Sequence, residues 1–80
     1  MDEATKNKIK SAIRGKVSAG FDKGTVTVYG AKFEWFETRD AVALDFVDTP
    51  SVFGSSYTVL DSTGVKVATF FEDPNTGVIS

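Results

Sequence analysis

The spacing of apolar residues changes near position 24, and this change constrains the fold more than any other feature of the sequence. Before it, Ile9, Ile13 and Val17 recur four residues apart, which places them on one face of a helix. After it, short runs alternate apolar with polar residues and are separated by Gly, Asp, Asn and Pro, which is typical of strands and turns. The sequence therefore predicts an α+β domain in which one helix precedes a sheet.

The first segment predicts an N-terminal amphipathic helix within residues 1–20. Asp2 and Glu3 stand where the positive end of the helix dipole favours acids. Gly15 weakens the interior by about 1 kcal/mol relative to Ala. The sequence leaves two possible C-terminal ends for this helix. It either stops at Gly15 or continues to Gly20, which then serves as its C-cap.

Residues 24–80 predict an antiparallel sheet of four or five strands, ordered mainly as neighbouring hairpins in a β-meander. The strand-like runs are residues 25–29, 31–37, 41–47, 57–61 and 65–72. The stretch 48–56 contains Pro50 and Gly54 and is expected to be a longer loop. Helix and sheet together make residues 1–80 a single small domain.

The predicted sheet carries more apolar side chains than one helix can cover, because a helix packs on only one face of a sheet. Alternation places some of them on the face opposite the helix, where Phe36, Val47 and Phe70 are expected, while Phe53 in the loop has no assigned place. Three arrangements remain open: the sheet curls into a small barrel, two copies pack face to face, or a different protein covers the face.

Charge divides along the same boundary as the hydrophobic period. The formal net charge is −2, but basic residues dominate positions 1–23 and acids dominate positions 24–80. Phosphate contacts by Lys6, Lys10, Arg14 and Lys23 would make the basic helix a weak nucleic-acid binder. The surplus of acids in the sheet disfavours that function.

The composition excludes several chemistries. The chain has no Cys and no His, so Ser-His-Asp and Cys-His nucleophilic sites and zinc sites built on those residues are ruled out. Glu34 and Asp45 are expected on adjacent strands, where a solvated charged face explains them better than a catalytic pair. The turn at 73–77 begins like a calcium loop but has no Glu to close it. We expect no catalytic, metal-binding or cofactor-binding residues and no enzyme activity.

The absence of cysteine also bears on location. Small secreted domains usually depend on disulfides, which favours a cytoplasmic protein here. No apolar run approaches the roughly eighteen residues of a membrane span, so no membrane association is expected.

Aromatic and acidic residues are concentrated in positions 32–48, and together they point to a protein interface. Aromatics anchor interfaces by burial, and an acidic rim steers basic partners. We expect a non-enzymatic protein-binding module that inhibits or modulates a larger protein, with basic nucleic-acid-handling proteins as one class of partner. Size and charge alone give an analogy with immunity proteins and phage-encoded inhibitors. The expected contact residues are Glu34, Phe36, Glu37, Asp40, Asp45, Asp48, Phe53 and Phe70.

Two alternative functions are also compatible with the sequence. A homo-oligomeric assembly subunit would use the same apolar face to close a homodimer. A nucleic-acid binder would use the basic helix, and it would lose affinity steeply with salt.

Overall fold

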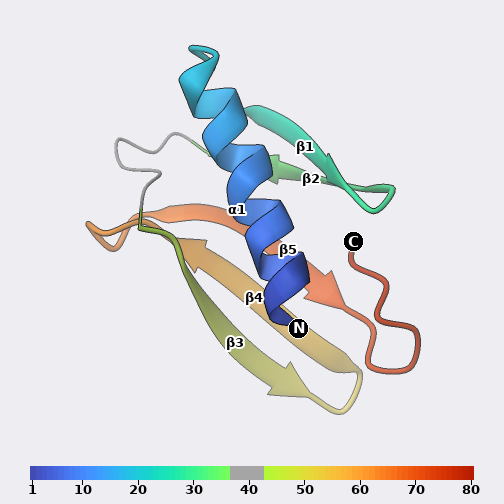
Figure 1. Cartoon of the computed structure of the whole chain (residues 1–80). Helices are drawn as coiled ribbons and strands as arrows, with labels where there is room; N and C mark the ends of the chain where they lie inside the picture. Colours follow the sequence, from blue (N-terminus) through green and yellow to red (C-terminus); the bar gives the residue numbers. More distant parts are fainter. Residues whose placement is uncertain (37–42) are drawn as a thin grey trace.

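The computed structural model describes residues 1–36 and 43–80, and it shows one helix on one face of an open antiparallel sheet (Figure 1). Within this described part the sheet has five strands, in the spatial order β1-β2-β5-β4-β3. The elements are α1 (Glu3–Ser18), β1 (Gly24–Val28), β2 (Ala31–Trp35), β3 (Asp45–Ser51), β4 (Gly54–Leu60) and β5 (Lys66–Glu72). The predicted α+β class, with a helix before the sheet, is confirmed. The sheet does not close into a barrel, since β1 and β3 are its two edges.

Helix α1 begins where the sequence predicts. The Asp2 side chain accepts a hydrogen bond from the Thr5 N–H at 2.8 Å and so caps the first turn. The hydrogen bonds from Thr5 lower the pKa of the Asp2 carboxyl. Ile9 and Ile13 are fully buried against the sheet, which confirms the predicted apolar stripe.

The helix ends in a Schellman motif after passing through Gly15. Gly20 has a φ of 89°, and its N–H donates to the Val17 carbonyl, while the Phe21 N–H donates to the Lys16 carbonyl. These two bonds satisfy carbonyls that the helix end would otherwise leave unpaired. Of the two ends left open by the sequence, the later one is therefore correct.

The strand order departs from a simple meander at one place. β1 with β2, β3 with β4 and β4 with β5 form the expected hairpins. However, β2 pairs with β5 through Trp35 and Ala68, so the chain crosses the sheet from β2 to the far edge at β3. β3, β4 and β5 are joined by hairpins, and β2, which precedes them in the chain, lies beside β5. This is a Greek-key order. Residues 78–80 pair with β5 further along, and Figure 1 shows the C-terminus between β2 and β5.

The predicted loop at 48–56 is wrong, because these residues form the β3–β4 hairpin. β3 continues to Ser51, β4 begins at Gly54, and only Val52 and Phe53 make the turn. Pro50 is tolerated because β3 is an edge strand, where a missing N–H need not break a ladder bond. The first two residues of the predicted run 41–47 lie outside the described residues.

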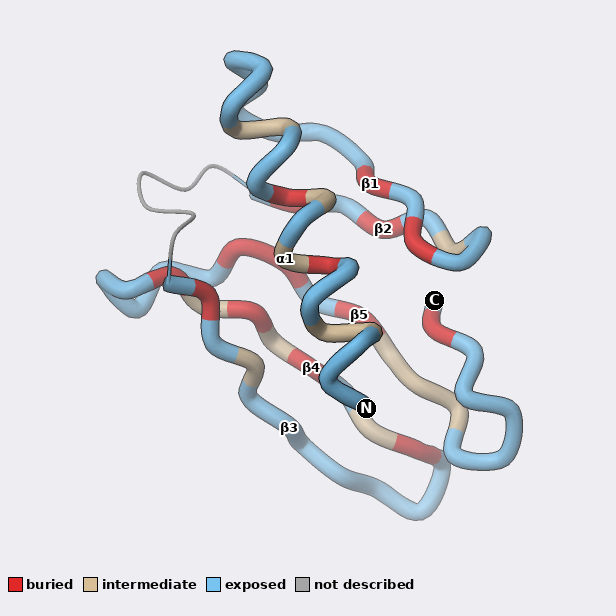
Figure 2. Tube along the Cα trace, in the orientation of Figure 1, coloured by how far each residue is buried: buried red, intermediate tan, exposed pale blue. Residues whose placement is uncertain are grey.

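The core lies between α1 and the sheet, as the buried segments in Figure 2 show. The buried hydrophobic residues are Ile9, Ile13, Val26, Val28, Phe33, Trp35, Leu44, Tyr57, Val59, Val67, Ala68, Phe70 and Ile79. Phe70 is central, since its ring centroid lies 5.3 Å from that of Phe33, 5.5 Å from that of Tyr57 and 6.0 Å from that of Phe46. The predicted placement of Phe70 on the uncovered face is therefore wrong.

A β-bulge explains this error. The register between β4 and β5 shifts at Val59 and Leu60, where Leu60 faces Lys66 and Val59 faces Ala68. Val67 is the extra residue, and both it and Ala68 are fully buried. Strict alternation fails at a bulge, because two successive residues no longer point to opposite faces. The sequence pattern alone therefore could not assign the faces of β5.

The turn between β4 and β5 is organised by one buried carboxylate. Asp61 Oδ1 accepts hydrogen bonds from the Thr63 N–H at 2.9 Å, the Thr63 hydroxyl at 2.6 Å and the Val65 N–H at 3.1 Å. Asp61 is 5 % exposed, so water cannot replace these bonds if the carboxylate is removed. The turn that aligns β4 with β5 thus depends on this side chain.

We predict that Asp61→Ala lowers the free energy of unfolding by about 2 to 3 kcal/mol, because buried donors lose a charged acceptor. Urea denaturation should show a lower midpoint with an unchanged slope. Asp73→Ala is the matched control, since Asp73 accepts from Asn75 and Thr76 in an exposed turn. Its loss should be about 0.5 to 1 kcal/mol. Equal losses in the two variants would contradict the role given to Asp61.

Candidate functional site

In the structure, the predicted contact residues lie on several different surfaces. Glu34 and Phe36 project from β2 onto the outer face, the face of the sheet opposite α1, as the burial of their neighbours shows. Asp45 points to the same face from β3, but β5 and β4 separate it from β2. The expectation that Glu34 and Asp45 lie on adjacent strands is therefore wrong. Glu37 and Asp40 lie outside the described residues.

Two further predicted residues face α1 instead. Phe70 is in the core, and Asp48 lies across from Tyr57, whose ring is buried on the helix side. Burial, and then the charges of Asp48 and Glu72, raise the pKa of Tyr57. The Met1 amino group donates to the Tyr57 hydroxyl at 2.8 Å and lies 3.2 Å from the Glu72 carboxylate. Asp48 and Glu72 thus make this end of the sheet electronegative, and Met1 offsets part of that charge.

The outer face is mixed in character. Phe36 is 43 % exposed and Val47 is 46 % exposed, but they project from strands that are not neighbours. Thr58 and Thr69 face each other on the two strands between them. The outer face therefore presents apolar side chains among hydroxyls, and the half-buried Leu60 of β4 and Phe71 of β5 also lie on it.

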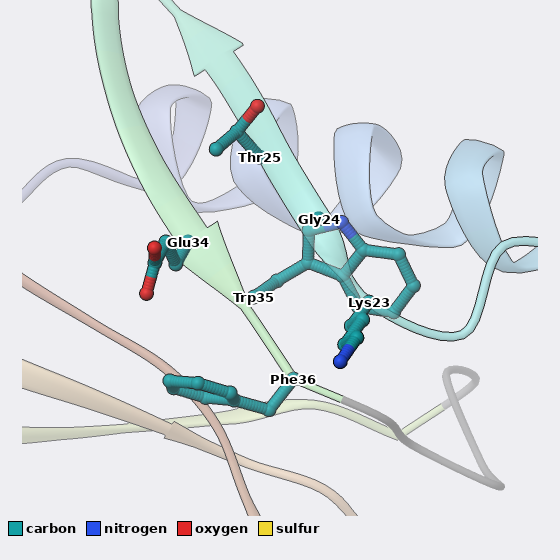
Figure 3. Close-up of a pocket in the computed structure, with 6 residues that line it drawn as sticks. All are labelled: Lys23, Gly24, Thr25, Glu34, Trp35 and Phe36. Carbon is teal, nitrogen blue, oxygen red and sulfur yellow. The ribbon is translucent and has the colours of Figure 1, made fainter.

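A shallow pocket of about 380 Å³ opens beside Phe36 at the start of β1. Its lining residues are Lys23, Gly24, Thr25, Glu34, Trp35 and Phe36. Figure 3 shows Lys23 close to the indole of Trp35, whereas the Phe36 ring points away from that indole, to the side on which the Glu34 carboxylate lies. The Trp35 indole N–H is buried and has no hydrogen-bond partner within the described part. The pocket is lined by two aromatic residues and by one charged residue of each sign. Such a lining fits the binding of a side chain better than it fits catalysis.

The most exposed apolar residues lie at the tip of the β3–β4 hairpin. Val52 is 91 % exposed and Phe53 is 80 % exposed, and Figure 2 shows the tip as a projecting, exposed loop. Phe53 is among the contact residues predicted from the sequence, whereas Val52 is not. The missed signal was two strand-like runs joined by a Val-Phe pair, where a turn normally carries Gly, Asn or Asp.

Hydrogen bonds within the turn hold this tip in place. The Ser51 hydroxyl donates to the Gly54 carbonyl at 3.0 Å and accepts from the Phe53 N–H at 3.3 Å. Below the turn, the Phe71 ring covers Gly54, where any Cβ would collide with that ring and with the Glu72 carbonyl. Gly54 also has a φ of 140°, a conformation that favours glycine. Both features fix the direction in which Val52 and Phe53 project.

The hairpin that carries the tip is acidic. Between Asp45 and Leu60 the charged residues are Asp45 and Asp48, and no Lys or Arg is present. Asp45 lies on the outer face and Asp48 on the helix side, so a carboxylate stands on each face of the hairpin. Asp48 stands near the apolar tip, three residues before Ser51, whereas Asp45 pairs with Leu60 at the opposite end of the hairpin.

Comparisons of the chain with family models, with curated proteins and with solved structures find no significant match. Across residues 1–36 and 43–80, no group of three or more Asp or Glu side chains is placed to hold a metal ion. In the same residues, no helix has the length and apolar character needed to cross a membrane. The functional inference therefore depends on the geometry and chemistry of the surfaces described above.

We predict that Gly54→Ala destabilises the fold by about 2 to 3 kcal/mol, since the new methyl group meets the Phe71 ring and a backbone carbonyl at a strained φ. Gly64→Ala is the control, because Gly64 also has a positive φ, of 82°, but has open space around it. That variant should lose only about 1 kcal/mol. Similar unfolding midpoints for both variants in urea would show that Phe71 does not pack on Gly54.

Proposed function

We propose that this chain is a small, non-enzymatic protein-binding module that inserts the tip of the β3–β4 hairpin into an apolar cleft of a larger protein and thereby inhibits or modulates it. One observation carries this proposal: Val52 and Phe53 are 91 % and 80 % exposed at the end of a hairpin. Folding gains little from two large apolar side chains held in water, whereas binding gains from burying them.

The expected binding energy from the tip is substantial. Full burial of a Val or Phe side chain contributes about 1.5 to 3 kcal/mol. The Ser51 hydrogen bonds and the packing of Phe71 on Gly54 fix the turn before binding. A fixed turn loses little conformational entropy on association, so more of the burial energy appears as affinity.

Charge supports a basic partner. Asp48 lies on the strand that leads to the tip, three residues before Ser51, and no Lys or Arg lies between Asp45 and Leu60. A cleft with an apolar floor and a rim of Lys or Arg complements this arrangement, and opposite charges raise the association rate. Nucleic-acid-handling proteins commonly carry such basic surfaces. A chain without cysteine suits a reducing compartment, so we place the partner in the cytoplasm.

The test compares wild type with a Val52→Ser/Phe53→Ser variant as bait in an extract of the source cells, with quantitative mass spectrometry as the readout. The control is Val65→Ser, because Val65 is half exposed in the turn at the opposite end of β4. We expect a protein that wild type and Val65→Ser retain and the tip variant loses. Titration of that purified protein should show affinity falling at least tenfold with Phe53→Ser alone.

Salt provides a second readout of the same complex. Raising the salt concentration should slow association, because it screens Asp48 from the basic rim. If the tip variant binds every retained protein as tightly as wild type does, the hairpin tip is not the binding surface and the proposal fails.

A further inference from the structure

The edge of the sheet at β1 is open to pairing. The turn of the β1–β2 hairpin is Tyr29 and Gly30, with φ of 50° and 80°, as in a type I′ turn. The pair flanking such a turn is hydrogen-bonded, and bonded pairs then alternate along the hairpin. By this alternation the N–H and C=O groups of Thr25 and Thr27 point away from β2. In Figure 1, β1 is the outermost strand on its side of the sheet.

The β1 edge also lacks the usual protection against pairing. Its sequence from Gly24 to Val28 contains no charge and no proline, and its side chains alternate regularly between exposed and buried. The other edge differs, because β3 carries Pro50, Asp45 and Asp48. Natural edge strands are commonly blocked by charge, proline or bulges. Only β3 is blocked in this way.

We propose that the β1 edge pairs with β1 of a second copy of this chain, antiparallel and around a two-fold axis at Val26. In this register Thr25 faces Thr27 of the second copy, and the outward backbone groups of both threonines are satisfied. Thr–Thr pairs across antiparallel strands are favourable, and the uncharged strands bring no like charges into opposition. Each pair occurs twice, as a two-fold interface requires.

The same register brings an exposed aromatic residue to the pocket described above. Continuing the pairing from Thr25 by two residues places Lys23 opposite Tyr29 of the second copy. Tyr29 is 68 % exposed, and its positive φ is uncommon for any residue other than glycine. Lys23 and Thr25 line the pocket beside Trp35 and Phe36. A tyrosine ring there covers apolar surface and can accept the Lys23 ammonium on its face.

This dimer leaves the proposed partner-binding tip accessible. The two β1 strands meet at the centre of a continuous sheet, so β3 of each copy stays at an outer edge. The interface involves one short strand and one side chain from each copy, which places it among the small, weak interfaces. We therefore expect association that depends on protein concentration. The inference does not depend on the function proposed for the hairpin tip.

The test is light scattering after size-exclusion chromatography over a hundredfold range of concentration. Wild type should approach twice the 8.6 kDa monomer mass at the highest concentration. Thr27→Lys should remain monomeric, because the new charge lies diagonally across from Lys23 of the second copy. Lys32 of the same chain lies directly opposite, so an unchanged far-UV circular dichroism spectrum must show that the variant is folded. Thr69→Lys is the control, since Thr69 is exposed on the central strand β5, and it should dimerise like wild type.

Tyr29→Asn separates dimerisation from folding. Asn-Gly is the preferred pair in a type I′ turn, so this variant should unfold at a higher temperature than wild type. It should nevertheless dimerise at least tenfold more weakly, because the ring that fills the pocket is gone. A monomer at every wild-type concentration overturns the proposal. A dimer that Thr27→Lys and Tyr29→Asn leave intact overturns it equally.

Discussion

A single helix can cover only one face of a sheet, and the rest of this structure follows from that constraint. Ile9 and Ile13 of α1 close a core that β2, β4 and β5 complete from one side, with Phe70 at its centre. The opposite face has no helix over it, and its central strands carry Thr58 and Thr69 there together with the half-buried Leu60 and Phe71. The most exposed large apolar residues of the described part, Val52 and Phe53, lie at a turn, which makes that turn the main candidate contact surface.

The fold class could be predicted from the sequence because it depends on local periodicity. The caps of α1 and the sorting of Phe33 and Trp35 to the core face needed only neighbouring residues. The pairing of β2 with β5 could not be predicted in this way, because it joins segments far apart in the chain. Nor could the faces of β5, because the bulge at Val67 breaks the alternation on which such an assignment rests.

The candidate site was predicted less well for a related reason. An aromatic residue without an evident partner in the sequence is predicted to be an interface anchor. This prediction is wrong for Phe70, whose partners come from β2, β3 and β4, and it stays a prediction for the exposed Phe53. Val52 was missed because Pro50 and Gly54 suggested a long loop, whereas they fit an edge strand and a tight turn. The exposure of Val52 and Phe53 can be recognised only once β3 and β4 are known to form a hairpin.

Both the one-sided core and the exposed tip are defined by which apolar side chains face water, and solvent paramagnetic relaxation of side-chain protons measures this. In dilute solution, a soluble paramagnetic agent should relax the Val52 methyl and Phe53 ring protons rapidly and leave those of Val59 and Phe70 almost unaffected. That result would confirm the exposed tip and the one-sided core together. Shielded protons at Val52 and Phe53, or rapid relaxation at Phe70, would contradict the account.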